Sequence, residues 1–404
     1  MPKMPLDGLK VADFGWVLVG PLTTKILASY GAEVIKLEGK TRADVCRTQG
    51  PFKLGEDTGL DKSYRFLWTN TGKLSATINL AHPKGIEIAK KFIAWADVVV
   101  DNYAGGAMER MGLGYENLKK VKRDIIMLST SMQGQTGPHA SHPGYGMQLT
   151  ALSGFDSITG WPDQGPVELG FYTDFIAPHI NIIAILAALD YKERSGNGQY
   201  IDISQYEAGV HFLAPLILDY AVNDRVAGRM GNSCENAAPH GVYRCLGQDR
   251  WCALAVFTDE EWQGFCKAIG RPTWTNDNRF STLLGRKENE DELNPLVESW
   301  TIHNSAEDIM LRLQEAGVGA GIAQTAEDLL ERDPHLEHRK FFWELPHPAV
   351  GTYHAMRPYF TLSKASFEMR RAPLIGEHND YAYRHVLGMS DEEIAQLVID
   401  GVIE

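Results

Sequence analysis

The chain has 404 residues, of which 44% are hydrophobic and 23% charged, and its formal net charge is -13 at pH 7. This length suits a large domain accompanied by a smaller one, and the composition excludes an intrinsically disordered chain. The negative charge excludes a general affinity for nucleic acid or anionic membranes, because both require clustered lysines and arginines.

The first residues, MPKMPLDGLKVADF, contain no apolar run of signal-peptide length, and no stretch reaches the roughly 20 apolar residues of a membrane span. We therefore expect a cytoplasmic protein that interacts with neither membranes nor nucleic acid. Five cysteines occur without a CxxC pair and without a histidine at metal-ligand spacing. The sequence accordingly predicts no metal site.

Apolar strands and helices alternate along the first 130 residues. The pattern predicts strands at 9–14 (LKVADF), 33–37, 97–102 (DVVVDN) and 124–131 (DIIMLSTS), with the clearest intervening helix at HPKGIEIAKKFIAWA. Such alternation implies a mainly parallel sheet covered on both faces. The predicted fold class is therefore α/β, with a Rossmann-like large domain.

A long apolar helix is predicted at 175–193, followed by the strand QYIDIS and a second helix at about 205–222. The next loop, 223–239, is rich in Gly, Asn and Ser, and we place a domain boundary there. A hairpin (HGVYRCLGQDRWCALAVF) and two helices then indicate a smaller α+β domain. We expect the chain to return to the first domain, which gives a large domain of 1–222 with 335–404 and a small domain of 223–334.

Several common functional motifs are missing. The first βα turn is GWVLVGP and lacks the GxGxxG that lets a backbone approach a pyrophosphate. No GxxxxGK[ST] loop, HExxH pair or GxSxG turn occurs. A plain dinucleotide enzyme, a P-loop protein, a zincin and a GxSxG hydrolase are therefore disfavoured at the motif level.

Asp174 ends the polar segment GFYTD, directly before the most apolar helix of the chain. One interpretation is structural, because Asp is a favoured N-cap and contributes about 1 kcal/mol through backbone N–H bonds. The other is chemical, because the same N–H groups and the helix dipole stabilise a carboxylate nucleophile. The residues alone leave both interpretations open.

Seven segments spread along the chain form a joint pattern. They are PLDGLKVADF, GP followed by GAEVIKLE, NTGKLSATINL, DNYAGGAMERMGLGYENL, MQGQTGP, the Asp174 segment with ILAALDYKERSGNGQYIDIS, and APLIGEHND. Together they resemble the class III CoA-transferases, the family of formyl-CoA transferase and carnitine CoA-transferase, which also includes α-methylacyl-CoA racemase. The resemblance runs almost from end to end.

The resemblance implies an enzyme that moves coenzyme A from an acyl-CoA to a carboxylic acid, with the CoA thioester as substrate and no cofactor. The nucleophilic aspartate of the family lies where Asp174 stands, and forms an aspartyl anhydride and then an aspartyl-CoA thioester. By motif position the CoA site comprises Val17, Asn70, Lys73, Asn102, Tyr103, Arg110 and Met111. Among these, Lys73 and Arg110 are expected to offset phosphate charge, and Tyr103 to pack on adenine.

The chain departs from the family at three places, one of which is the stretch 231–241, where no counterpart of the tetraglycine loop of formyl-CoA transferase occurs. Leu18 stands where some members carry a glutamine near the reacting thioester. The arginine often found after Glu38 is replaced by Gly39, which leaves Lys40 or Arg42 as stand-ins. The contacts to the acyl group and to the CoA phosphates are therefore expected to differ from those of other members.

Two alternative functions stay open. The racemase carries a histidine-aspartate pair where this chain has Gly144-Tyr145-Gly146, and Tyr145 is a poor base because the reference pKa of tyrosine is about 10. The other alternative is a non-catalytic CoA-binding subunit of a hetero-oligomer, against which the presence of Asp174 argues. The transferase is the favoured interpretation.

Aromatic residues in the flanking segments suggest the acceptor. A substrate pocket is expected to include Trp16, Leu18, Tyr145 and Tyr172, with Phe171 and Trp161 in neighbouring segments. An aryl-substituted or dicarboxylic acid such as benzylsuccinate, with succinyl-CoA as donor, is the resulting hypothesis. The resemblance also implies an interlocked dimer, either of two identical chains or with a related subunit.

Overall fold

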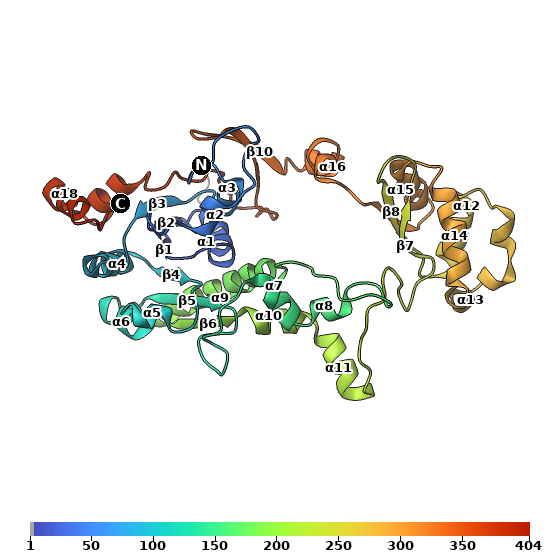
Figure 1. The fold of residues 1–404 in the computed structure, drawn as a ribbon, viewed down its shortest axis with the longest axis horizontal. Coiled ribbons are helices and arrows are strands. Elements are labelled where there is room, and N and C mark those ends of the chain that lie inside the picture. Colours follow the sequence, from blue (N-terminus) through green and yellow to red (C-terminus); the bar gives the residue numbers. More distant parts are fainter. Residues whose placement is uncertain (1–3) are drawn as a thin grey trace. The chain divides into compact units, whose positions relative to one another are not determined.

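The computed structural model describes residues 4–404, which form two compact units (Figure 1). The first unit comprises the chain up to Phe155 together with Glu168–Val226 and Glu337–Glu404, and the second comprises Asp156–Val167 and Ala227–Leu336. The boundaries expected from sequence lie within four residues of the two main divisions. The sequence did not assign Asp156–Val167 to the second unit.

A six-stranded sheet forms the centre of the first unit, in the order β3-β2-β1-β4-β5-β6. All neighbouring strands are parallel. The strands are β1 (Lys10–Asp13), β2 (Glu33–Glu38), β3 (Leu74–Thr77), β4 (Val98–Asp101), β5 (Ile126–Ser131) and β6 (Tyr200–Ser204). This confirms the predicted α/β fold class with a Rossmann-like parallel sheet.

The helices of the first unit connect or follow these strands. They are α1 (Val19–Ser29), α2 (Val45–Thr48), α3 (Tyr64–Thr69), α4 (Pro83–Trp95), α5 (Ala107–Arg110), α6 (Tyr115–Val121), α7 (Gly146–Leu152), α9 (Thr173–Ser195), α10 (Gln205–Phe212) and α11 (Ala214–Asn223). The returning segment adds the hairpin β10 (Phe342–His347) and β11 (Gly351–Met356), a π-helical turn (Tyr381–Val386) and α18 (Asp391–Ile399). Two short helices, α8 (Phe155–Ile158) and α17 (Pro334–His338), lie at unit boundaries.

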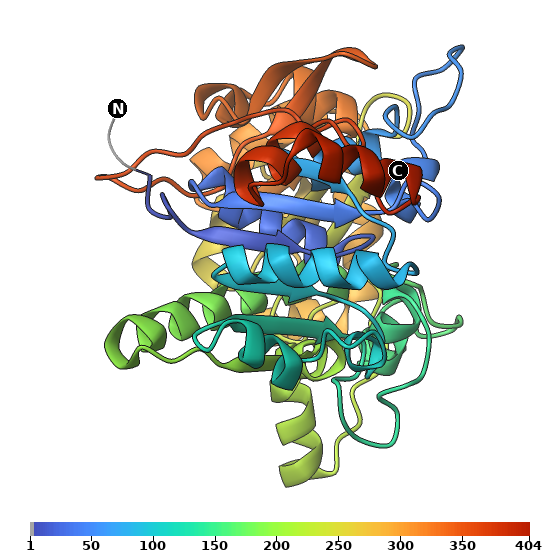
Figure 2. The ribbon, with the colours of Figure 1, turned by 90° about the vertical axis from the view of Figure 1, so that its left-hand side faces the viewer.

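Side chains alternate between the two faces of the parallel sheet, as the pleat requires. On one face Ile35 and Val99 pack against α4 and against residues of the returning segment. On the other face Val34 and Val98 pack against α1 and α9. Figure 2 shows α4, in cyan, with its axis along the direction of the strands on the first of these faces. Both faces are therefore covered, as the continuous apolar strands predict.

The strand β3 was not predicted, because LSAT is short and half polar. Its position depends on the returning segment of the chain. The Thr77 N–H donates to Asn379 Oδ1 at 2.8 Å, and the Gly376 N–H donates to Ser75 Oγ at 2.9 Å. The Tyr383 hydroxyl donates to the Thr77 carbonyl at 2.7 Å. These contacts join the two ends of the chain within one unit.

The helix predicted at 205–222 is two helices in the structure, because α10 ends at Phe212 and α11 begins at Ala214 with Pro215 in its first turn. The long apolar helix α9 is long and apolar enough to cross a membrane by length and composition, and 44% of the qualifying window is buried. Its buried residues Ile185 and Ala188 pack on the sheet. In this fold α9 is a core helix with one uncovered side.

The second unit is built on an antiparallel sheet in the order β7-β8-β9, formed by β7 (His240–Arg244), β8 (Trp251–Ala255) and β9 (Gly319–Ile322). The predicted hairpin is confirmed as β7 and β8. Trp262 and Phe265 lie in the core beneath this sheet. The helices are α12 (Asp259–Ala268), α13 (Leu283–Glu288), α14 (Glu290–Thr301), α15 (Ala306–Glu315) and α16 (Ala326–Glu331), with two 3-10 turns at Thr273–Asn276 and Asn278–Phe280.

Candidate active site

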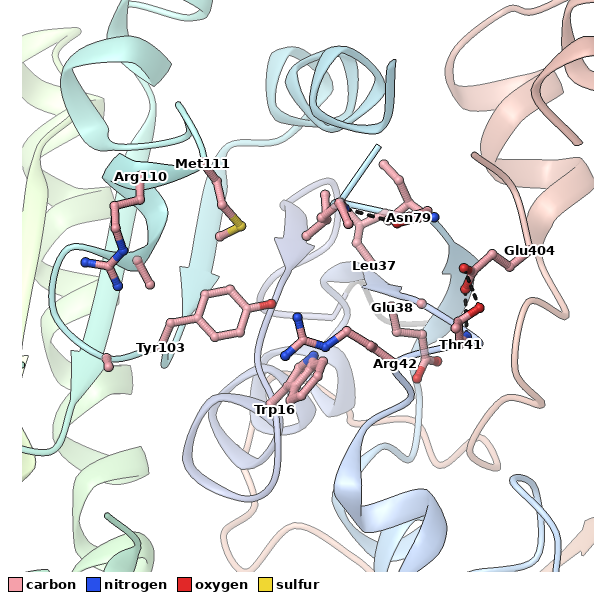
Figure 3. A pocket seen from close by; sticks show the side chains of 16 residues that line it. Trp16, Leu37, Glu38, Thr41, Arg42, Asn79, Tyr103, Arg110, Met111 and Glu404 are labelled. Atoms are coloured by element: carbon pink, nitrogen blue, oxygen red, sulfur yellow. Dashed lines mark hydrogen bonds between the residues drawn. The ribbon is translucent and has the colours of Figure 1, made fainter. Parts of the chain in front are cut away.

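A cavity of about 780 Å³ lies in the first unit, beside the carboxyl ends of β2, β3 and β4 and the loop that follows β1. Ligands of open α/β sheets bind at this end of the strands. The labelled wall residues in Figure 3 include Trp16, Arg42, Tyr103, Arg110 and Met111, together with backbone from the turns after β2 and β3. Tyr103, Arg110 and Met111 of the predicted CoA site therefore share one cavity, which Trp16 also lines.

Arg42 and Arg110 supply the positive charge of this cavity. Both guanidinium groups belong to exposed side chains, and the Arg110 Nη1 donates to the Gly105 carbonyl at 3.3 Å. Figure 3 shows Arg42 reaching toward Tyr103 and Trp16. Of the two proposed stand-ins for the missing arginine, Arg42 lines the cavity and Lys40 does not. Flexible guanidinium groups of this kind bind phosphate oxygens.

Asn102 holds the loop after β1. Its side-chain oxygen accepts the Trp16 N–H at 2.7 Å, and its amide nitrogen donates to the Trp16 carbonyl at 2.8 Å. The Trp16 ring then lies edge-on to Tyr103, with 6.2 Å between ring centroids. Asn102 was expected among the CoA contacts, but it does not line the cavity and its amide is engaged with Trp16.

Lys73 and Asn70 lie in a buried ion network, outside the cavity wall. The Lys73 ammonium donates to Asp13 Oδ2 and to Asn70 Oδ1, each at 2.9 Å, and the Lys73 and Asp13 side chains are fully buried. The Asn70 amide nitrogen donates to the Phe66 carbonyl and the Thr69 hydroxyl. The expectation that Lys73 offsets phosphate charge is therefore corrected, because its ammonium neutralises Asp13.

Two more fully buried ion pairs lie beside the same strand ends. Lys36 pairs with Asp44 at 3.0 Å, and Arg47 pairs with Glu38 at 2.8 Å. Asp44 Oδ1 also accepts the Val17 N–H at 3.1 Å, and Val17 has the left-handed backbone angle φ 62°. The network thus fixes the loop after β1. Val17, expected in the CoA site, is a strained residue of this loop and not a lining residue of the cavity.

Glu404 fixes another wall of the cavity. Its carboxylate accepts the Thr41 N–H at 2.8 Å and the Thr41 hydroxyl at 2.7 Å, while its carbonyl accepts the Thr77 hydroxyl at 2.8 Å. These bonds hold the turn that carries Arg42 (Figure 3). Sequence reasoning missed Glu404, because no local pattern relates it to a residue 363 positions away.

Asp174 lies in the first turn of α9. The N-cap is Tyr172, and no side chain caps the helix, so the capping interpretation of Asp174 is wrong. Asp174 as a residue is 9% exposed, and within residues 4–404 its carboxyl group makes no hydrogen bond and no ion pair. Burial raises the pKa of Asp174 to about 7, because the charged form loses its hydration. An ionisable group that is buried without a partner is typical of functional sites.

The Asp174 carboxyl group touches Gly146, the first residue of α7: a β-carbon on Gly146 would lie 2.6 Å from Asp174 Oδ2. The same β-carbon would lie 2.6 Å from Phe171 Cβ. The centroids of the Phe171 and Phe175 rings are 5.7 Å apart, and those of Phe175 and Trp68 are 6.0 Å apart. The segment that carries Asp174 is therefore rich in aromatic contacts. Sequence reasoning did not identify Gly146 as part of this arrangement.

The loop after β1 connects the cavity with this apolar environment. Trp16 lines the cavity, whereas Val17 and the buried Leu18 belong to the apolar cluster against which Phe171 packs. Leu18 thus shares an apolar cluster with Phe171, three residues before Asp174.

The two tyrosines of the predicted substrate pocket are exposed. Tyr145 precedes α7, is 64% exposed and donates its N–H to Gln148 Oε1 at 3.0 Å. Tyr172 is 45% exposed and lies edge-on to Phe155, with centroids 5.2 Å apart. Trp161 belongs to the second unit. Among the residues that the structure describes, no group of three His, Cys, Asp or Glu side chains is arranged to hold a metal ion.

Comparison with known proteins identifies the class. The model of CoA-transferase family III matches residues 6–379. The chain belongs to this family and is a class III CoA-transferase, an enzyme that exchanges coenzyme A between an acyl-CoA and a carboxylic acid.

Relatives cover the chain over its full length. Succinyl-CoA–D-citramalate CoA-transferase of Chloroflexus aurantiacus is 31% identical over 100% of this chain and 99% of that protein. Human succinyl-CoA:glutarate CoA-transferase is 30% identical over 99% of this chain and 90% of that protein. The crystal structure of a CAIB/BAIF family protein from Brucella suis superposes with a TM-score of 0.86 at 30% identity, covering 95% of this chain and 100% of that one.

Proposed function

We propose that the enzyme transfers CoA from succinyl-CoA to a second carboxylic acid, with Asp174 as the residue that becomes acylated. The observation that carries the proposal is the state of Asp174, a carboxyl group that is buried without a partner at the start of α9. It lies beside an apolar cluster that continues from the loop lining the charged cavity. A buried carboxylate without hydrogen bonds is a stronger nucleophile than a hydrated one.

The reaction divides into two symmetric halves. Asp174 Oδ attacks the thioester carbonyl of the donor, the C–S bond breaks, and an aspartyl anhydride and CoA thiolate form. The thiolate then attacks the aspartyl carbonyl, which releases the donor acid and leaves an aspartyl-CoA thioester. The acceptor carboxylate reverses both steps, so that the new acyl-CoA departs and the Asp174 carboxylate is regenerated. No net proton transfer is required.

The cavity is the proposed site of the CoA nucleotide. Arg42 and Arg110 carry the positive charge that phosphates require, and Tyr103 with Trp16 offers aromatic surface for adenine. Asn102 holds Trp16 from outside the cavity wall, and Glu404, which itself lines the cavity, holds the turn that carries Arg42. This replaces Lys73, Asn70 and Val17 of the sequence-based site by residues that face the cavity.

For the acceptor we propose a dicarboxylic acid. The similar transferases are named for citramalate, glutarate and L-malate. Phe171 and Phe175 stand on either side of Asp174 in the sequence, and Trp68 packs against Phe175; these aromatic residues favour an acid that also carries an aromatic group, such as benzylsuccinate. A panel of succinate, glutarate, malate, citramalate and benzylsuccinate with succinyl-CoA tests this choice. If the enzyme turns over the aliphatic acids faster than benzylsuccinate, the proposed preference for an acceptor with an aromatic group is wrong.

We also propose that a second chain covers the uncovered side of α9 and α11, as an interlocked dimer requires. Ile183 and Leu186 of α9 and Leu218 and Val222 of α11 are large apolar side chains exposed in the single chain. Related transferases for L-malate have alpha and beta subunits, so the second chain is either identical or related. Native mass measurement of the purified protein distinguishes a homodimer from a heterodimer, and a monomer contradicts the proposal.

The covalent role of Asp174 is tested with Asp174→Asn. We expect the exchange of CoA between succinyl-CoA and an acid to fall by at least about 10³-fold, because the nucleophile is lost. Mass spectrometry of the wild-type enzyme mixed with acyl-CoA should place a CoA adduct on the peptide containing Asp174. Undiminished exchange by the variant excludes the covalent mechanism, and absence of any adduct and of any exchange in the wild type favours a non-catalytic subunit.

A further inference from the structure

Gly146 and Asp174 approach each other more closely than any other residue type at position 146 would permit. A β-carbon at this position would lie 2.6 Å from Asp174 Oδ2, 2.7 Å from Asp174 Cγ and 2.6 Å from Phe171 Cβ. Real β-carbons do not approach other heavy atoms so closely, so an added side chain requires both the Asp174 carboxyl group and the Phe171 β-carbon to move away, or Gly146 itself to move. The surroundings decide which of these groups moves furthest.

Moving the backbone of α9 away from Gly146 would break several contacts. The Asp174 N–H donates to the Phe171 carbonyl at 3.0 Å, and Phe171 packs into an apolar cluster beside the Phe175 ring. Two turns further along the helix, the buried Asn181 amide donates to the Thr23 hydroxyl at 2.9 Å. These contacts tie the start of α9 to α1 and to the cluster.

The backbone of α7 is held equally firmly. The Thr150 hydroxyl donates to the Gly146 carbonyl at 2.8 Å, and the Leu149 side chain has no exposure. A β-carbon on Gly209 of α10 would lie 2.6 Å from the Oγ of Ser153, the C-cap residue of α7, and 3.1 Å from a methyl group of Thr173 in α9. Since α10 packs closely against both helices, α7 and α9 cannot simply separate.

The Asp174 side chain is the group that moves at the lowest energetic cost. Rotation about its torsion angles breaks no hydrogen bond or ion pair within residues 4–404. We propose that Gly146 is a positioning residue, whose missing side chain fixes the place of the Asp174 carboxylate and whose replacement displaces it. The proposal rests on the nucleophilic role of Asp174 proposed above. A displacement of about 1 Å costs an enzyme roughly 10²-fold in rate, because the nucleophile leaves its line of attack.

Gly144 provides a matched control two residues away. A β-carbon on Gly144 would meet the far end of the Met132 side chain, at 2.7 Å from Cε and 3.0 Å from Sδ. A methionine has three rotatable side-chain bonds and moves aside readily. Gly144→Ala therefore adds the same methyl group to the same segment without touching the nucleophile.

The test compares Gly146→Ala with Gly144→Ala in steady-state exchange and in adduct formation at Asp174. For Gly146→Ala we expect kcat and the rate of adduct formation to fall by roughly 10²-fold with an unchanged KM for the acyl-CoA. Gly144→Ala should stay within about twofold of the wild type in both quantities. Adduct formation by Gly146→Ala at the wild-type rate overturns the proposal, and so does a loss that appears mainly in KM.

A thermal-stability cycle provides a second measurement that does not need activity. Because the displaced group is the Asp174 carboxyl, Gly146→Ala should lower the Tm less in an Asp174→Ala background than in the wild type. Equal losses in both backgrounds overturn the proposal. If the wild-type enzyme forms no adduct at Asp174, the proposed function is contradicted instead. The stability cycle then still shows whether a side chain at position 146 displaces the Asp174 carboxyl group.

Discussion

Two groups of buried charges in the first unit differ in how they are neutralised. At the strand ends, Asp13, Asp44 and Glu38 are fully buried and each contacts a lysine or arginine within 3.0 Å. Asp174 is nearly as buried and has no ionic partner among the described residues.

The pKa values of the paired Asp13 and the unpaired Asp174 shift in opposite directions. Lys73 and Lys36 outweigh burial and lower the pKa of Asp13, whereas burial alone raises the pKa of Asp174 to about 7. The paired charges hold loops in place, whereas the unpaired carboxyl group of Asp174 is the one to which we assign the proposed reaction. On this proposal, pairing as well as burial has to be considered when structural carboxylates are separated from functional ones.

The largest effect on stability is expected when one of the buried ion pairs at the strand ends is removed. Lys73→Met should lower the free energy of unfolding by about 3–5 kcal/mol, because it leaves the Asp13 carboxylate buried without its cation. Lys25→Met is the matched control, since burial lowers the pKa of Lys25 to about 7 and its ammonium donates to the Trp68 carbonyl and not to a carboxylate. Denaturant unfolding measures both, and equal losses contradict the pairing argument.

Replacing Asp174, the unpaired carboxylate, by a neutral residue should raise the free energy of unfolding instead of lowering it. The folded pKa of Asp174 is raised from 3.8 to about 7, so the folded state binds the proton more tightly, and this group loses stability as the pH rises through that window. Asp174→Asn should therefore be more stable than the wild type at pH 8, by up to about 1.4 kcal/mol for each unit of pKa shift. The gain should disappear near pH 4, and denaturant unfolding across this range follows it.

The same ionisation should control the rate. In the proposed mechanism only the carboxylate form of Asp174 attacks the thioester, so kcat/KM should rise about tenfold per pH unit below pH 7 and level off above it. A profile that stays flat between pH 5 and pH 8 is incompatible with a nucleophile of raised pKa. A pH series with saturating acid acceptor provides the measurement.

The smallest effects are expected at the cavity. Arg42→Ala and Arg110→Ala should each raise the KM for succinyl-CoA about fivefold, roughly 1 kcal/mol, because exposed guanidinium groups are partly screened by salt. Both effects should shrink as ionic strength increases, while kcat stays unchanged. Lys40→Ala, on the same turn but outside the cavity wall, is the control and should behave like the wild type.

The sequence predicted most of the α/β fold because its strands are strongly apolar and its helices periodic. It missed β3, whose four residues depend on contacts with a segment about 300 positions away. It assigned Lys73 to phosphate binding because motif position says nothing about where an ammonium points. The environment of Asp174 could not be predicted from the sequence either. Its raised pKa and its contact with Gly146 arise from the packing of segments in the folded chain, which no local pattern records.

The dependence of β3 on the returning segment has a consequence for protein synthesis. Thr77 and its partner Asn379 are 302 residues apart, which is on the order of 15–60 s of translation at roughly 5–20 residues per second. During that interval the outer edge of the large sheet lacks the residues that later cover it, and an open edge strand pairs readily with other chains. We therefore expect the nascent enzyme to be prone to aggregation during this interval, and substitutions at Asn379 or Tyr383 to reduce the yield of soluble enzyme more than its turnover.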